Sequence, residues 1–217
     1  MSKAYALPAR SQSVGEEIAN AVSHGIGSLL AMIAALVLVV DAVQRGRVAE
    51  IVGASIFGAT MVLAYLTSTL YHALPMNRAK QVFRTLDHGA IFLLIAGSYT
   101  PFTLGPLRGI WGWTLLGLVW GLAFAGVVFK FNGGVRHPKL STCLYIAMGW
   151  LVIVAIEPLS RKVPMAGLLW LFAGGVAYTA GVAFFAPRRL RYSHFVWHLF
   201  VVAGSACHFA AVLWYAL

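Results

Sequence analysis

Seven stretches of this sequence are apolar for long enough to cross a lipid bilayer, for which a helix needs about 20 residues. Only 10% of the residues are charged, against roughly 25% in soluble domains. A helix in water needs a polar face, whereas a helix in lipid can be apolar all round. We therefore expect an all-α integral membrane protein with a seven-transmembrane-helix bundle. The predicted spans are 18–42, 51–74, 88–104, 110–129, 140–158, 165–186 and 193–216.

The remainder of the chain consists of short polar connectors and a polar N-terminal segment. We expect a short cytoplasmic tail at 1–15, without the apolar stretch of a secretion signal, and one membrane domain over 16–217. The net charge of +10 is spread between the apolar runs, so it does not form the basic face of a nucleic-acid-binding fold. We therefore expect membrane lipid as a partner, and no nucleic acid.

The distribution of Lys and Arg predicts the orientation, because positively charged loops are retained in the cytoplasm. The N-terminal tail and the second, fourth and sixth connectors hold eleven of the sixteen basic residues, and the other three connectors hold five. This asymmetry predicts a cytoplasmic N-terminus and a C-terminus outside.

In that topology, four spans bring polar side chains to the cytoplasmic face. Ionisable residues inside membrane spans are costly and typically mark a function. These residues are Glu16, Glu17, Asn20 and His24 in the first span, Ser68 and His72 in the second, Asp87 and His88 at the third, and His194 and His198 in the seventh.

The spacing within this group is typical of a metal site. His194 and His198 are four residues apart, which places both imidazoles on one helical face, about 6 Å apart along the axis. Two histidines so placed can bind one ion. His72 on another span would complete the three-histidine set of a catalytic zinc site. Asp87 could then orient the water bound to the metal or accept its proton.

Several polar residues leave two interpretations open. Glu16, Glu17 and Asn20 either belong to the site or are residues that the helix dipole favours in a first turn. Glu17, Asn20 and His24 share a helical face. His208 lies ten residues beyond His198, about 15 Å along the helix, too far to bind the same ion. It either lines a cavity above the metal or forms a plain buried hydrogen bond.

Four segments resemble the hemolysin III family of bacterial membrane proteins, within the progestin and adipoQ receptor superfamily. They read "EEIANAVSHGIG", "STLYH", "RTLDHGAIFLLIAGSYTPF" and "SHFVWHLFVVAGSACHF". The resemblance implies a multi-pass protein of the bacterial inner membrane with a cytoplasmic N-terminus. It also implies zinc held by His72, His194 and His198, with Asp87 contacting the metal-bound water and Ser68 as the motif serine near the site.

Three functions are compatible with these features. The first is a zinc-dependent, ceramidase-like hydrolase that acts on a lipid amide or ester. The second is a non-enzymatic membrane-homeostasis regulator or receptor with structural zinc, and the third is a membrane-lytic hemolysin. A retinal protein is excluded because no lysine lies in the interior of a span, and a haem protein is disfavoured because His194 and His198 share one helical face.

Overall fold

The computed structural model describes residues 12–185 and 190–217. Most of the predicted tail, and residues 186–189 with two of the arginines counted in the sixth connector, therefore lie outside the described residues. All regular structure in the described part of the chain is helical, as predicted. The elements are α1 (Val14–Arg45), α2 (Val48–Ala73), α3 (Arg78–Leu104), α4 (Ile110–Phe131), η1 (Gly134–Arg136), α5 (Pro138–Gly149), η2 (Trp150–Ala155), α6 (Ile156–Ser160), α7 (Met165–Phe185) and α8 (Ser193–Tyr215).

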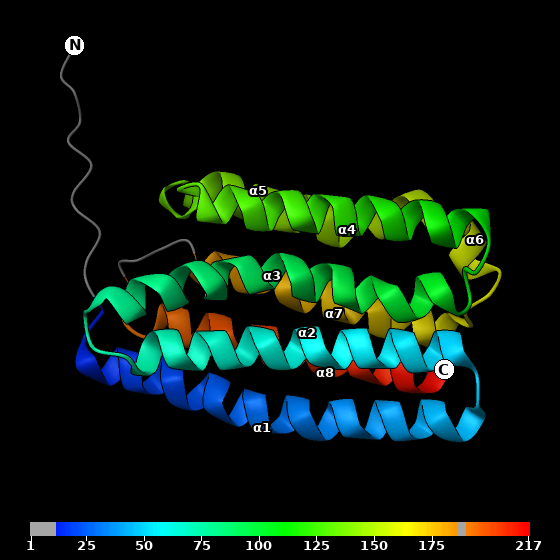
Figure 1. The fold of residues 1–217 in the computed structure, drawn as a ribbon, viewed down its shortest axis with the longest axis horizontal. Coiled ribbons are helices and arrows are strands. Elements are labelled where there is room, and N and C mark those ends of the chain that lie inside the picture. Colours follow the sequence, from blue (N-terminus) through cyan, green and yellow to red (C-terminus); the bar gives the residue numbers. More distant parts are fainter. Residues whose placement is uncertain (1–11, 186–189) are drawn as a thin grey trace, which may run out of the picture.

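The long helices run side by side along the length of the molecule, with α1 at one side and α4 and α5 at the other (Figure 1). The beginnings of α1, α3 and α8 and the end of α2 lie together at one end of the bundle (Figure 1). We call this the histidine end. The four polar segments singled out in the sequence therefore meet, even though up to about 180 residues separate them along the chain.

Among the described residues, six segments are long and apolar enough to span a membrane, with Pro138–Ser160 counted as one. The predicted span at 88–104 lies within α3, which does not reach that apolarity. Polar residues such as Asp87, Thr100 and Thr103 reduce the hydropathy of this helix. Because α3 packs against α2, α4, α5 and α8, protein covers much of its surface, and a helix covered by protein can be more polar than one that faces lipid.

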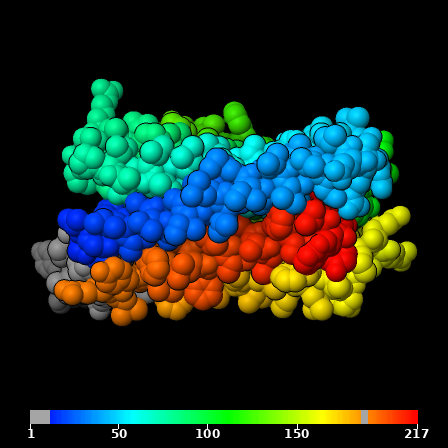
Figure 2. Space-filling model, turned by 90° about the horizontal axis from the view of Figure 1, so that it is seen from below, coloured from blue at the N-terminus to red at the C-terminus, as the bar shows by residue number. Residues whose placement is uncertain are grey.

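The surface of α1 indicates directly that lipid surrounds the bundle. The outward side chains of Ile18, Val22 and Ile33 are more than half exposed, whereas Asn20 and His24 on the opposite face are buried. A helix in water shows the reverse arrangement. Figure 2 shows α1 on the surface between α2 and α8.

The predicted span at 140–158 is divided into two α-helices by the 3-10 segment η2. The Tyr99 hydroxyl accepts a hydrogen bond from the Val152 backbone N–H at 2.9 Å and lies 2.8 Å from the carbonyl oxygen of Gly149, to which it can donate. Irregular backbone at membrane depth needs such partners, because lipid offers none. A side chain from α3 therefore stabilises the break, which the local sequence did not predict.

A candidate metal centre

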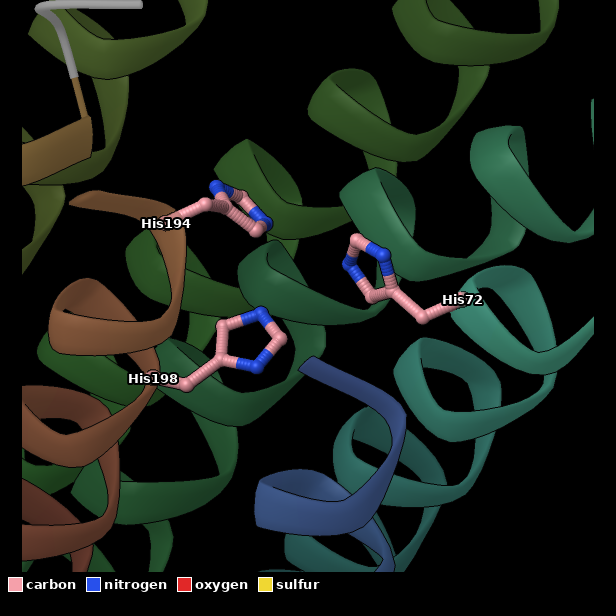
Figure 3. A group of neighbouring side chains, drawn as sticks. All are labelled: His72, His194 and His198. Atoms are coloured by element: carbon pink, nitrogen blue, oxygen red, sulfur yellow. The ribbon is translucent and has the colours of Figure 1, made fainter. Parts of the chain in front are cut away.

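His72 on α2 and His194 and His198 on α8 come together at the histidine end (Figure 3). Their ligand atoms all lie within 4.8 Å of one another, so the group could hold a metal ion. The four-residue spacing on α8 places the ring centroids of His194 and His198 4.6 Å apart, and the His72 ring centroid is 5.1 Å from each. The predicted convergence of these three histidines is therefore confirmed.

The hydrogen bonding of His72 suits a metal ligand. Its Nδ1 lies 2.7 Å from Glu17 Oε2. Because a carboxylate only accepts hydrogen bonds, Nδ1 carries the hydrogen and the lone pair of the ring remains on Nε2. Nε2 is buried and has no hydrogen-bond partner among the described residues. A histidine oriented by a carboxylate on one nitrogen, with the other free to ligate, is the usual arrangement in zinc proteins.

His198 is also held by α1, through a hydroxyl and a backbone oxygen in place of a carboxylate. Its Nδ1 lies 3.0 Å from Ser23 Oγ and 3.3 Å from the backbone oxygen of Asn20, which also accepts a hydrogen bond from Ser23. The amide of Asn20 is 3.5 Å from His72 Nδ1. One turn of α1 therefore contacts the outer nitrogens of two of the three histidines, and their inner nitrogens face the centre of the group.

His24 contacts the site without joining the group of candidate ligands. Its ring stacks on that of His198 with centroids 3.5 Å apart and an angle of 9° between the planes. Both of its nitrogens are buried and lack a hydrogen-bond partner in the described part of the chain. The Tyr65 ring meets it edge-on at 5.0 Å. His24 therefore orients His198 by packing.

A cavity of about 410 Å³ begins beside the histidines, and Ser68, Asp87, His194 and His198 line it. Ser68 is buried, and within the described residues its hydroxyl has no hydrogen-bond partner. Asp87 Oδ2 lies 3.5 Å from His88 Nδ1, which donates to the backbone oxygen of Arg84 at 2.7 Å. The structure thus places both predicted catalytic residues in the wall of one cavity with two of the candidate ligands.

The cavity continues towards the opposite end of the bundle. Asp87 and Thr103 both line it and are sixteen residues apart on α3, which is about 24 Å at 1.5 Å per residue. Most of the remaining wall is apolar, and at the far end it includes Leu107, Leu115 and Leu168. The cavity is therefore long and mostly apolar.

A family model described as haemolysin-III related matches residues 12–209. The chain belongs to this family. It is 47% identical over 206 residues to hemolysin-3 of Bacillus cereus, and this match covers 95% of this chain and 94% of that protein. It is 45% identical over 205 residues to the hemolysin-3 homolog of Bacillus subtilis (strain 168), covering 94% and 96%. Human monocyte to macrophage differentiation factor is 27% identical over 173 residues, covering 75% of this chain and 70% of that protein.

All the candidate site residues lie inside the segment matched by the haemolysin-III model. Of the four residues predicted as surroundings of the metal, the structure brings three to the histidines: Glu17, Asn20 and His24. The fourth, His208, lines the cavity apart from them. Its Nε2 lies 3.4 Å from the backbone oxygen of Leu171, and its Nδ1 is without a partner among residues the structure describes.

Three features of this haemolysin-III site were absent from the sequence-based prediction. Ser23 contacts His198, and Lys80 contacts Glu17. Glu16 accepts a hydrogen bond from the Tyr192 backbone N–H at 2.9 Å, which connects the beginnings of α1 and α8. Ser23 was within reach of a helical-face argument, since it lies three residues after Asn20. Lys80 had no comparable signal, because it resembles any basic residue in a cytoplasmic connector.

Proposed function

We propose that this haemolysin-III family protein is a zinc-dependent hydrolase that cleaves a lipid amide or ester inside the bacterial inner membrane. One observation carries the proposal. Three histidines that could hold one ion lie at the end of a long apolar cavity. The carboxylate of Asp87 lines the same cavity, as does the hydroxyl of Ser68, which has no hydrogen-bond partner among the described residues. The apolar cavity would hold the hydrocarbon chain and position the amide or ester carbonyl at the histidines.

The donor set fits zinc. Three imidazoles, of which His72 and His198 have outer nitrogens oriented by α1, and space for another ligand on the cavity side match the catalytic zinc pattern. Zinc held in this way polarises a carbonyl and makes water nucleophilic near neutral pH. The residues of the chain supply the remaining functions. Asp87 holds the attacking water, accepts its proton and returns that proton to the amine or alcohol that leaves as the amide or ester bond breaks. The Ser68 hydroxyl donates to the substrate carbonyl oxygen as negative charge develops there. The apolar wall excludes bulk water.

We further propose seven membrane spans, with α3 as the seventh, a cytoplasmic N-terminus and an external C-terminus. The excess of Lys and Arg in alternate connectors supports this topology, as does the central position of α3, which reduces the apolarity it needs. The test uses a reporter enzyme that is active only outside the cytoplasm. The reporter should be active when it is fused after Leu217 and inactive when it is fused in the 74–77 connector. The opposite result would reverse the orientation.

The test of the proposed function is metal analysis and turnover with purified protein. Wild type in lipid nanodiscs should contain about one zinc per chain and release fatty acid from N-acyl sphingoid or acyl ester probes. His194→Ala should lose both properties, whereas His137→Ala, which removes an exposed histidine in a connector, should lose neither. Zinc without turnover, together with a melting temperature that falls on chelation, would instead support a structural metal in a regulator or receptor. Wild type without zinc would refute the proposal.

The name of the Bacillus cereus relative, hemolysin-3, favours a second candidate function, membrane lysis. Purified protein added to liposomes that contain a trapped dye separates the two. Dye release that His194→Ala retains would favour lysis independent of the metal. Intact liposomes, with hydrolysis of the acyl probes, would exclude lysis as the direct activity.

A further inference from the structure

Lys80 is a buried cation in the first turn of α3. Its side chain is 8% exposed, whereas Arg78, two residues earlier, is exposed. Lysine is almost never buried unless it is paired, because removing its charge from water is costly. Leucine or methionine would fill the same volume without that cost. The position therefore calls for an explanation in the partners of the ammonium group.

Within the described part of the chain, the ammonium group of Lys80 contacts three groups. Nζ lies 3.2 Å from Glu17 Oε1 and donates to the backbone oxygen of Leu74 at 3.1 Å. It also lies over the Tyr71 ring, 5.0 Å from its centroid. The other oxygen of the same carboxylate, Glu17 Oε2, is the one that accepts from His72 at 2.7 Å. Lys80, Glu17 and His72 therefore form a continuous line from α3 through α1 to α2.

We propose that Lys80 and Glu17 are positioning residues for the metal centre. Lys80 fixes one carboxylate oxygen so that the other faces His72 Nδ1, and this hydrogen bond keeps the lone pair on Nε2 directed at the metal. The proposal rests on the metal binding of the proposed function, but it does not depend on hydrolysis. It adds α3 as a third helix, besides α1 and α2, that determines the orientation of His72.

A purely structural role for Lys80 makes a different prediction. Its bond to Leu74 closes the connector between α2 and α3, and that contribution to stability does not involve Glu17. If Lys80 acts on the metal through Glu17, its effect on metal affinity vanishes once Glu17 can no longer transmit it. A double-mutant cycle measured on metal affinity distinguishes the two roles.

The experiment is a zinc titration against a chromogenic chelator, with metal-depleted protein in nanodiscs. Glu17→Gln should weaken binding by about 10–100-fold, the usual loss for a residue that orients a zinc ligand. Lys80→Met should weaken it by about tenfold within that same range, and Lys80→Arg should restore part of the loss. Lys80→Met added to Glu17→Gln should cause no further loss. Lys139→Met removes an exposed lysine and should leave the affinity unchanged.

Two further measurements separate an effect on the metal ligands from an effect on protein stability. The visible spectrum of the cobalt-substituted protein should shift in Lys80→Met if the ligand geometry changes, and the melting temperature of the metal-free protein reports stability alone. Zinc affinity in Lys80→Met equal to wild type, or losses that multiply in the double variant, would overturn the positioning role. Wild type that binds no metal would overturn the proposed function as well, so the two failures are distinguishable.

Discussion

At the histidine end, the cavity wall carries His194, His198, Asp87 and Ser68, and hydrogen bonds from α1 orient the group. At the opposite end, the wall is formed by side chains such as Leu107 and Leu168. Both ends belong to one continuous space. In the proposed function, recognition and chemistry would be separated along the bundle axis: the far end would hold the hydrocarbon chain, and the histidine end would act on its polar terminus. Substitutions at the two ends should therefore change different quantities.

The largest effect is expected for Asp87→Asn. Removing a residue that takes up a proton during the reaction typically costs about 10²–10⁴-fold in turnover, and the zinc content should remain at the wild-type level because Asp87 is outside the histidine group. Asp41→Asn, which alters a carboxylate paired with Arg45 in the last turns of α1, is the matched control and should behave as wild type. Loss of zinc in Asp87→Asn would show that this carboxylate is a ligand.

Ser68→Ala should reduce turnover by about 10²–10³-fold, the usual loss when one hydrogen-bond donor to a developing oxyanion is removed. Stability should change little, because within the described residues this hydroxyl has no partner to lose. The comparison variant is Ser160→Ala, an exposed serine at the opposite end. Equal turnover in the two variants would remove Ser68 from the mechanism.

Leu168→Trp should shorten the cavity at its far end. We expect the ratio of kcat/KM for long-chain over short-chain substrates to fall about tenfold, since each methylene in an apolar pocket is worth about 1–3 kcal/mol. Zinc content and turnover of the short substrate should be unchanged. Leu169→Trp is the natural control, because the next side chain along α7 is 58% exposed. An equal loss for both chain lengths would contradict the division between the two ends.

The smallest effect is expected for His208→Leu, which lies between the two ends. Its bond to Leu171 is long, at 3.4 Å, so the free energy of unfolding should change by about 0.5–1.5 kcal/mol. Zinc affinity should not change, because His208 is outside the histidine group. Denaturation in detergent and chelator titration check the two quantities. A fall in zinc affinity would mean that the two regions are coupled.

The sequence predicted the elements of the site that depend on spacing within one helix. The four-residue interval of His194 and His198, and the agreement in depth with His72, were sufficient to predict the convergence that the structure confirms. Their binding of metal stays a prediction. Six of the seven spans, those that are long and apolar enough among the described residues, were also predictable, because apolar runs of this length have few other solutions.

Spacing within one helix could not predict the contacts between helices. Ser23 and His198 are 175 residues apart, and the sequence of neither segment indicates that the other is its partner. Lys80 lies in a segment that was predicted as a connector, and the orientation rule already explained its charge. The break at η2 depends on Tyr99, a residue of another helix. In each case the deciding interaction is set by the rotation of one helix against its neighbour, which the period of a single helix does not determine.

The polar inner face of α1 has a consequence for biosynthesis. Glu17, Asn20 and Ser23 on α1 leave the ribosome well before His194 and His198 on α8. Until α8 arrives, α1 must keep these groups shielded from lipid by other means or remain near the membrane surface. Helices α1 and α8 must therefore meet before the site exists, so a chain interrupted anywhere before α8 lacks two of the three histidines that could hold a metal.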